Sequence, residues 1–360
     1  MVDPVSLAKA LIAAESVTPA KGEVFDVTER ALTEAGFAVT RMTFQAEGTP
    51  AVENLYATKG TGGRHLAFAG HVDVVPPGPL DAWSTPPFDP AIDGDTLSGR
   101  GAVDMKGGVA AMIAAGAEWA QSGSAGQVSF VITGDEEGPA VNGTLPLMKW
   151  CAERTRFDGC IVGEPTSRTR LGDTIKVGRR GSLSGTVVVG GRQGHVAYQH
   201  AAHNPVPECL AIGAALNATL DSGTEEFAPS NLEIVSIDVG NEAWNVIPPS
   251  ISLRFNVRFN DTWTVETLTA ELEARIKAAA PEADATVSFL PAFGAFLTRD
   301  TALIDAVSDA VEAATGVRPE ATTGGGTSDA RFIKDFCPVV EFGDVGSTMH
   351  QVNERTSIAQ

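Results

Sequence analysis

The chain has 360 residues and a formal net charge of −19 at pH 7, with 43% hydrophobic and 20% charged residues. These proportions exclude a disordered chain and allow one large or two ordinary domains with a substantial core. The acidic balance argues against a nucleic-acid-binding protein, which needs a basic face.

The N-terminal half of the sequence alternates helical and strand-like segments. Apolar residues recur at helical spacing in the first two segments, and Gly36 is a stop signal for the second. The short apolar runs that follow are typical of buried strands in a largely parallel sheet. In chain order we predict helices at 4–15 and 24–35, strands at 38–44, 54–58 and 66–70, a loop rich in Pro, Gly and Asp at 74–98, and a helix at 106–121.

The pattern changes near residue 179. From there the segments follow a β-α-β-β-α-β order, which is the split βαβ or ferredoxin-like motif. After Pro291 the earlier alternation returns. The predicted segments of this half are strands at 181–189, 232–239, 251–259 and 285–289 with helices at 204–220 and 265–279, then a helix at 301–315 and a strand at 339–342.

Two domains follow from this change of pattern. Residues 1–178 and 293–360 are predicted to form an α/β domain with a doubly wound mixed sheet. Residues 179–292 are predicted to form an inserted ferredoxin-like α+β domain. The smaller domain therefore interrupts the larger one in sequence.

The sequence gives little sign of disulfides or of a membrane segment. Four cysteines are scattered without a C-x-x-C pair, which favours reduced thiols over a disulfide framework or a cysteine zinc site. No basic segment followed by an apolar stretch opens the chain, and no run approaches the ~18 apolar residues of a membrane span. We therefore expect a cytoplasmic protein. The cysteines are Cys151, Cys160, Cys209 and Cys337.

Residues that can bind a metal follow short apolar runs at four places. The carboxyl ends of parallel strands meet at one edge of a sheet, where ligands bind, so we expect these residues to share one site. A further carboxylate lies in the glycine-rich stretch 99–108. The five candidates are His71 after 65–70, Glu137 after 128–132, Glu164 after 160–163, His350 in the loop after 339–342, and Asp104.

This set of two imidazoles and three carboxylates suits Zn, Mn or Co. One zinc would use three or four ligands and leave the others as costly unpaired buried charges. Two metals ~3.5–4 Å apart that share one carboxylate would use all five. Asp104, in its glycine-rich loop, is the natural bridge. His71 and Glu164 would then bind one metal, and Glu137 and His350 the other.

Two neighbouring carboxylates are predicted to act beside the metals. Asp73, two residues beyond His71, is placed to accept the imidazole N–H and fix its tautomer. Glu136 should point away from the ligands and serve as a general base toward metal-activated water. Without the other metal-ligand candidates, the acidic run 135–137 would be interpreted as an exposed turn. For His65, His200 and His203 we favour an ordinary structural role.

A glycine-rich run at 324–329 could suggest a phosphate loop. It lacks the Gly-Lys-Ser/Thr ending that a nucleotide-binding loop needs. A loop leading into a helix N-terminus that holds a substrate carboxylate is the better interpretation, because free backbone N–H groups there favour anions.

At these residues the chain resembles the M20 family of metallopeptidases. The matching segments span nearly the whole chain in the family's order. They are GHVDVVPPG (70–78), GRGAVDMKGG (99–108), TGDEEG (133–138), VGEPT (162–166), GRRGSLSG (178–185), GHVAYQH (194–200), GGGTSDARF (324–332) and EFGDVGSTMHQVNE (341–354). Within the family, GRRGSLSG, GHVAY and GTSDARF favour members that remove a succinyl group from an amine.

The resemblance implies two zinc ions per subunit, with cobalt or manganese as substitutes, held by the five predicted ligands with Asp104 bridging. It implies that Glu136 is the acid/base and that Asp73 orients His71. It also implies a cis peptide bond between Asp104 and Met105. These implications agree with the roles that the residues themselves suggest.

The resemblance further implies a homodimer formed through the inserted domain, which would act as a lid and lend residues to the partner's site. His195 would hydrogen-bond the developing oxyanion, with Tyr198 and Asn245 beside it; read without the resemblance, Asn245 is a turn residue. Gln199 stands where the family usually has Pro. The residues implied to bind substrate carboxylates are Arg179, Ser182, Arg258, Gly326 and Thr327.

The implied activity is hydrolysis of an amide in a small, multiply anionic substrate, with no nucleic-acid or membrane partner. A deacetylase or aminoacylase of the same family would share the metals and Glu136. Such an enzyme would differ in the anion-binding set, because acetyl substrates offer one carboxylate fewer. A non-catalytic binding protein is disfavoured, because neither a ligand nor the acid/base residue is missing.

Overall fold

A computed structural model describes residues 2–360, which divide into two compact units. The first unit comprises Met1–Val177, Thr298–Thr322 and Ser328–Gln360, and the second comprises Gly178–Leu297 with Thr323–Thr327. The second unit extends beyond the predicted residue 292, because strand β16 (Phe296–Leu297) pairs with β9 (Gly178–Arg179). The two ends of the segment Gly178–Leu297 in the second unit therefore lie side by side as paired strands.

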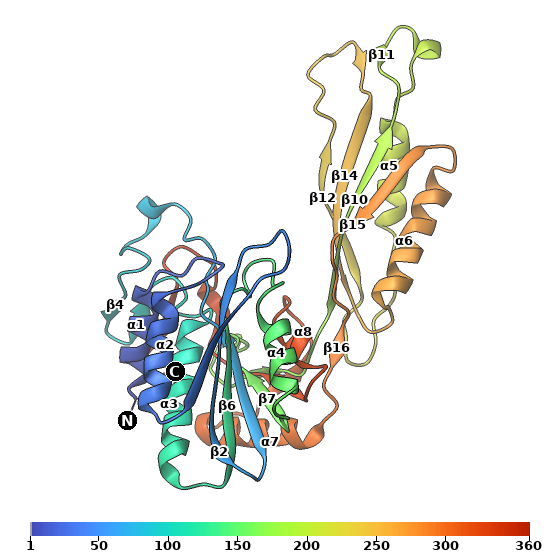
Figure 1. The fold of residues 1–360 in the computed structure, drawn as a ribbon. Helices are drawn as coiled ribbons and strands as arrows, with labels where there is room; N and C mark the ends of the chain where they lie inside the picture. The colour runs from blue at the N-terminus through green and yellow to red at the C-terminus, as the bar shows by residue number, and fades with distance from the viewer. Residues whose placement is uncertain (1) are drawn as a thin grey trace. The chain divides into compact units, whose positions relative to one another are not determined.

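The first unit is built on an eight-stranded mixed sheet, as predicted (Figure 1). The central strands β6, β3, β7 and β18 run parallel, whereas β1–β2, β2–β6 and β18–β8 are antiparallel. In sheet order the strands are β1 (Ala38–Phe44), β2 (Val52–Thr61), β6 (Gly126–Thr133), β3 (His65–His71), β7 (Gly159–Val162), β18 (Val339–Glu341), β8 (Thr174–Lys176) and β17 (Glu320–Thr322).

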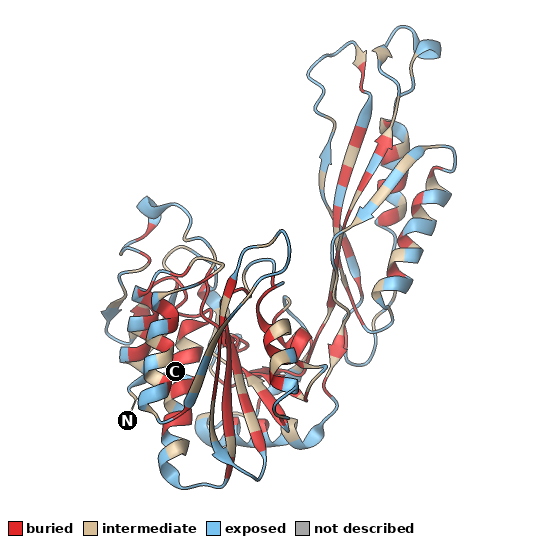
Figure 2. Ribbon diagram, in the orientation of Figure 1, coloured by how far each residue is buried: buried red, intermediate tan, exposed pale blue. Residues whose placement is uncertain are grey.

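Helices bury the central strands of this sheet, which explains their nearly continuous apolar sequence (Figure 2). Asp3 caps the first helix by accepting the Ser6 N–H, and Pro4 occupies its first position. The helices are α1 (Pro4–Ala13), α2 (Glu23–Glu34), α3 (Lys106–Ser122), α4 (Thr144–Ala152), α7 (Thr301–Thr315) and α8 (Ala330–Ile333).

Close packing between α3 and the sheet depends on glycine. A Cβ at Gly116 would lie 2.6 Å from the ring of Phe130 on β6. Leu11 and Ile12 of α1 belong to the same buried cluster as Val109 and Ile113 of α3. This core fixes α3, and therefore the glycine-rich loop that leads into it.

The prediction of a mostly irregular loop at 74–98 is correct in outline, but the segment contains short helical and strand elements. A 3-10 turn, η1 (Leu80–Ala82), precedes strands β4 (Ala91–Asp93) and β5 (Thr96–Ser98). They form a small sheet with β19 (Arg355–Ser357), more than 250 residues away in sequence. The partner strand could not be recognised locally.

The second unit has the predicted ferredoxin-like fold. Its four-stranded antiparallel sheet has the order β12-β14-β10-β15, and one face packs on two helices in a separate hydrophobic core. Helix α5 is shorter than predicted because it begins after Pro205 and ends at Leu216. The elements are β10 (Gly181–Gly190), α5 (Val206–Leu216), β12 (Asn231–Asp238), β14 (Ser250–Phe259), α6 (Val265–Ala279) and β15 (Asp284–Phe289).

A separate pair of short strands, β11 (Gly194–His195) and β13 (Val246–Ile247), extends the second unit beyond the end of β10. Within this unit, β11 and β16 lie at opposite ends (Figure 1). No helix within residues 2–360 combines the length and apolarity that crossing a membrane requires.

Candidate metal centre

The ends of adjacent parallel strands bring the predicted ligands together. His71 ends β3, which lies between β6 and β7 in the sheet. Glu137 follows β6 by four residues, and Glu164 follows β7 by two. His350 comes from the loop after β18, the next parallel neighbour of β7. The sheet topology therefore delivers four ligand candidates to one edge.

Asp104 lies between the two histidines. His71 Nε2 is 3.1 Å from Asp104 Oδ1, and His350 Nε2 is 3.1 Å from Asp104 Oδ2. On the outer sides, His71 Nε2 is 3.8 Å from Glu164 Oε1, and His350 Nε2 is 2.8 Å from Glu137 Oε1. The side chains thus form two halves that share one carboxylate.

The glycine-rich loop presents Asp104 from the side of the sheet. Gly101 in this loop has a φ of +85°, in the left-handed region that favours glycine. The peptide bond between Asp104 and Met105 is cis, as the resemblance implied. The Asp104 side chain is only 6% exposed.

Asp73 contacts His71 through its main-chain oxygen and, at a longer distance, through its carboxylate. The closest partner of His71 Nδ1 is the main-chain oxygen of Asp73, at 2.9 Å, whereas the Asp73 carboxylate is 3.5 Å away. That carboxylate also accepts the backbone N–H groups of Glu136 at 3.2 Å and Glu137 at 3.0 Å. Asp73 therefore positions both the imidazole and the acidic loop.

Glu136 does not point away from the ligands as predicted. One of its oxygens lies within 4.8 Å of ligand atoms of both His71 and Glu164. Burial raises the pKa of Glu136 well above its usual range, and the nearby carboxylates of Asp329 and Glu164 add to that rise. Two adjacent carboxylates, at 136 and 137, therefore enter one cluster from one turn, which only the three-dimensional path of the turn reveals.

Arg331 and Asp329 were missed by the sequence analysis. Arg331 Nη1 is 3.9 Å from Glu136 Oε1, and its Nη2 is 3.8 Å from Asp329 Oδ1. Thr144 donates a hydrogen bond to Asp329 Oδ2 at 2.6 Å. Both residues belong to the GGGTSDARF segment, where an acid and an arginine two residues apart were the available signal.

The electrostatics of the ligand cluster fit divalent metal ions. We define this cluster as the five predicted ligands together with the adjacent carboxylate of Glu136; the ligands are His71, Asp104, Glu137, Glu164 and His350. Hydrogen bonds to Asp104 and Glu137 raise the pKa of His350 to about 10. Burial raises the pKa of Asp104, but hydrogen bonds from His350 and His71 outweigh it and lower the pKa below its usual range. Buried carboxylates at this density need cations, and oxygen with imidazole nitrogen is a set that zinc, cobalt and manganese accept.

The predicted carboxylate-binding residues lie in the second unit. Arg179 on β9 is 8% exposed and donates from Nη1 to the main-chain oxygen of Gly326 at 3.1 Å. Ser182 and Arg258 are directly opposed on β10 and β14. Thr327 belongs to the same unit as Gly326.

His195, Tyr198 and Asn245 form a second group on that unit. The rings of His195 and Tyr198 are 5.5 Å apart, and the Val196 N–H donates to the main-chain oxygen of Asn245 at 3.1 Å. His195 Nδ1 accepts the Ala197 N–H at 3.1 Å. In the neutral ring this contact assigns the proton to Nε2, which makes Nε2 a donor.

The glycine-rich run at 324–329 does not lead into a helix suited to anion binding. Helix α8 is a single turn of four residues, and the residue at its N-cap is Asp329, whose carboxylate is buried. A second negative charge is disfavoured beside a buried carboxylate. Helix α8 therefore does not support the anion site at its N-terminus, and carboxylate binding by Gly326 and Thr327 of the preceding loop stays a prediction.

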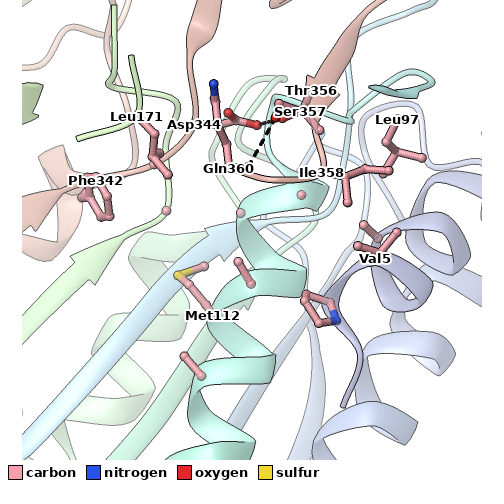
Figure 3. A pocket seen from close by; sticks show the side chains of 18 of the residues that line it. Val5, Leu97, Met112, Leu171, Phe342, Asp344, Thr356, Ser357, Ile358 and Gln360 are labelled. Atoms are coloured by element: carbon pink, nitrogen blue, oxygen red, sulfur yellow. Dashed lines mark hydrogen bonds between the residues drawn. The ribbon is translucent and has the colours of Figure 1, made fainter. Parts of the chain in front are cut away.

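An apolar cavity of about 350 Å³ lies elsewhere in the first unit (Figure 3). Val5 of α1, Met112 of α3 and Ile358 near the C-terminal end line it, with Asp344 at its edge. No residue of the ligand cluster lines this cavity. Its chemistry is that of an apolar space and not of an amide-hydrolysing site.

Known proteins resemble this chain in sequence over nearly its full length. The model of peptidase family M20/M25/M40 matches residues 67–360. Succinyl-diaminopimelate desuccinylase of Methylorubrum populi is 54% identical over 366 residues, covering 99% of this chain and 94% of that protein. The desuccinylase of Methylocella silvestris is also 54% identical, over 361 residues, covering 98% of this chain and 93% of that protein.

Solved structures share the fold. An M20 family metallo-carboxypeptidase from Sulfolobus solfataricus superposes with a TM-score of 0.80 at 15% identity, covering 100% of this chain and 96% of its own. A dinuclear metal-binding M20 peptidase from Bacillus subtilis has a TM-score of 0.68 at 16% identity, covering 94% and 88% of the two chains. At these identities the likeness concerns the fold alone.

Proposed function

The chain belongs to peptidase family M20/M25/M40, and we propose that it is a metal-dependent succinyl-diaminopimelate desuccinylase. The reaction is hydrolysis of the amide of N-succinyl-LL-2,6-diaminopimelate to succinate and LL-2,6-diaminopimelate, a step of lysine and diaminopimelate biosynthesis. The observation that carries the proposal is 54% identity to a desuccinylase over 99% of the chain, together with the five predicted ligands lying side by side.

Two zinc ions per subunit are the proposed cofactors, with cobalt or manganese as substitutes. His71 and Glu164 would hold one, Glu137 and His350 the other, and Asp104 would bridge them. The Asp104 oxygens each lie 3.1 Å from a different histidine, which supports this division. Bound metals of this kind supply Lewis acidity, which acidifies water and polarises an amide carbonyl.

Glu136 is the proposed general base and acid. Its carboxylate takes a proton from the attacking water and later delivers it to the leaving amine, so that the amide C–N bond breaks with a neutral amine as product. Arg331 and the Asp73 carboxylate hold Glu136 from opposite ends, through its side chain and its backbone N–H. The base is thereby aimed at the centre of the ligand cluster.

The second unit supplies the proposed substrate contacts. Arg179, Ser182, Arg258, Gly326 and Thr327 would bind the carboxylates of the substrate. An arginine can hold a carboxylate with two parallel hydrogen bonds, which gives selectivity for a succinyl over an acetyl group. These residues create local positive charge and donor density in a chain whose net charge is −19.

A homodimer is the proposed assembly, and the geometry of the second unit supports it. Arg179 precedes β10 and His195 follows it, and a ten-residue strand spans roughly 33 Å. One copy of this unit therefore cannot bring both residues to one small substrate. His195, with Tyr198 and Asn245, would act in the site of the partner subunit, where its Nε2–H stabilises the oxyanion.

The proposed function is tested by initial rates of the zinc-loaded protein on N-succinyl-LL-diaminopimelate and N-acetylornithine, with a chelator-treated control. We expect a strong, chelator-sensitive preference for the succinyl substrate. Preference for the acetyl substrate would instead indicate a deacetylase of the same family. Absence of hydrolysis of both would contradict an amidohydrolase.

A further inference from the structure

Glu354 lies at the end of the HQVNE segment, and its side chain is fully buried. It has no role in the ligand cluster or among the proposed substrate contacts. Its carboxylate faces the glycine-rich loop that carries Asp104. A buried carboxylate surrounded by donors is a costly feature unless each lone pair is satisfied.

Four donors satisfy this carboxylate. Glu354 Oε1 accepts the backbone N–H of Val103 at 2.8 Å and that of Asp104 at 3.1 Å. Glu354 Oε2 accepts the backbone N–H of Gly101 at 2.9 Å and Arg100 Nη1 at 2.7 Å. The Glu354 carbonyl also accepts the Gly99 N–H at 3.0 Å. The loop from 99 to 104 is therefore fastened at five points to one residue.

The same residue anchors the loop that carries His350. His350 and Asn353 adopt left-handed backbone conformations, with φ of +62° and +60°, which non-glycine residues rarely hold without support. Thr348 donates to the main-chain oxygen of Arg355 at 2.8 Å and accepts its N–H at 3.1 Å, which closes this loop around Glu354. Glu354 lies one residue after Asn353, so its buried contacts hold the strained loop in place.

We propose that Glu354 is a positioning residue that sets the distance between Asp104 and His350 and so prepares the metal centre for binding. The inference rests on the proposed function, because it concerns the same ligand cluster. Asp104 and His350 are far apart in sequence, and Glu354 connects their two loops directly. Arg100 supports it from the other side and stacks over the Trp83 ring at 5.3 Å.

The test is the Glu354→Gln variant. Its carboxamide has the shape of the Glu354 carboxylate, but an NH₂ group replaces one acceptor oxygen and faces the N–H donors of the loop. Glu53→Gln is the matched control, because Glu53 also accepts a backbone N–H, from Gly22 at 2.7 Å, and an arginine, Arg41 at 2.9 Å. Zinc affinity and stoichiometry are measured by calorimetry on the metal-free proteins. Circular dichroism and the thermal unfolding midpoint report whether each variant is folded.

We expect Glu354→Gln to bind zinc about 10- to 100-fold more weakly than the unaltered protein, with Glu53→Gln unchanged. The kcat of the zinc-loaded variant should fall while KM stays constant. Unchanged zinc affinity in folded Glu354→Gln would overturn the proposal, as would an equal loss in Glu53→Gln.

A second variant, Arg100→Lys, tests the proposal if Glu354→Gln does not fold. Arg100→Lys keeps the positive charge but loses the guanidinium fork, and it should weaken zinc binding less than Glu354→Gln would. Full zinc affinity in Arg100→Lys would then overturn the proposal. Zinc affinity does not depend on substrate identity, so a protein inactive on the succinyl substrate could still show the Glu354 effect. The two proposals therefore fail separately.

Discussion

Glu136, the proposed general base, lies where its surroundings raise its affinity for a proton and restrict its position. Burial and the carboxylates of Asp329 and Glu164 hold its pKa well above the usual range, which increases its affinity for a proton. Arg331, with Nη1 at 3.9 Å, limits that increase and restricts where the side chain can lie. A base with a raised pKa is better matched to neutral pH than an ordinary exposed carboxylate.

The Glu136→Gln variant should lose about 10²- to 10⁴-fold in kcat, because an amide cannot accept the proton of water. Its zinc content should remain that of the unaltered protein. Metal analysis and steady-state rates on the succinyl substrate measure the two quantities. Near-normal turnover with both metals bound would contradict the assignment of Glu136.

The Asp73→Asn variant separates the support that His71 receives from the Asp73 main-chain oxygen from the support that it receives from the Asp73 carboxylate. Its main-chain oxygen, which contacts His71 Nδ1, would remain, but one acceptor for the N–H groups of Glu136 and Glu137 would be lost. We expect kcat to fall about 10- to 100-fold with little change in zinc affinity. If zinc affinity fell instead, the carboxylate would be the main support of His71, as the sequence alone predicted.

Strands β7 and β18 are parallel neighbours, and a glycine allows the backbone segments that follow them to approach each other closely. Gly343 follows β18, and a Cβ there would lie 2.5 Å from the main-chain oxygen of Glu164 and 2.7 Å from that of Gly163. The φ of Gly343 is not positive, so the constraint is space and not backbone conformation. Glu164 is thus positioned partly by the absence of a side chain across from it.

The Gly343→Ala variant should be less stable by about 1–3 kcal/mol, because backbone at both strand ends must move. It should also bind zinc more weakly, since Glu164 moves with its carbonyl. Gly294→Ala is the control, because no atom lies within 4 Å of a Cβ there. Chemical denaturation and calorimetry measure the two effects, and equal behaviour of the two variants would contradict this explanation.

The second unit should lose stability in acid through Asp221. Burial raises the pKa of Asp221, but hydrogen bonds from Ser230, Trp263 and Gly223 outweigh it and lower the pKa to about 2. The folded-state pKa lies below the unfolded value of roughly 3.9, so this stabilisation is complete above that pH. It is lost as the pH falls through about 2.

The Asp221→Asn variant provides the measurement. Its unfolding free energy in the second unit should be lower than that of the unaltered protein at pH 6, and the difference should shrink as the pH falls from 4 toward 2. Hydrogen exchange of peptides from α6 reports this unit specifically. A difference that does not depend on pH would show that the Asp221 charge is not responsible.

Sequence periodicity predicted the long elements well, because each is specified by its own residues. Helices α6 and α7 begin and end at the predicted residues, and the apolar alternation of β14 was visible in the chain. The β4-β5-β19 sheet was not predictable in this way, because three-residue strands depend on distant partners. The same reason hid the role of Glu354, whose contacts lie about 250 residues earlier.

The sequence predicted which residues form the ligand cluster, but not the directions in which their side chains point. Residue types at strand ends identified His71 and Glu164, the glycine-rich loop identified Asp104, and the fold gathered them as expected. The path of the turn after β6 is not encoded in such a pattern, so Glu136 was expected to point away. Main-chain contacts, such as that of the Asp73 carbonyl with His71 Nδ1, are likewise invisible in residue types.

Removal of metal should destabilise the first unit as a whole. The ligand cluster gathers four carboxylates with two imidazoles, and cations that bind only the folded state stabilise it by mass action. We expect chelation to lower the thermal unfolding midpoint and abolish hydrolysis, and added zinc to restore both. A midpoint that does not respond to metal would contradict a preformed metal centre in the folded chain.

The fastening of Asp104 by Glu354 has a consequence for the order of events during synthesis. The two residues are separated by 250 positions, so at 5–20 residues per second the ribosome adds Glu354 roughly 12–50 s after Asp104. Until then the strands bearing His71 and Glu164 exist without the segment that supplies His350 and anchors the Asp104 loop. Metal acquisition is therefore expected to follow translation of the segment that contains His350 and Glu354, so a nascent chain that has reached only Glu164 cannot yet form the centre.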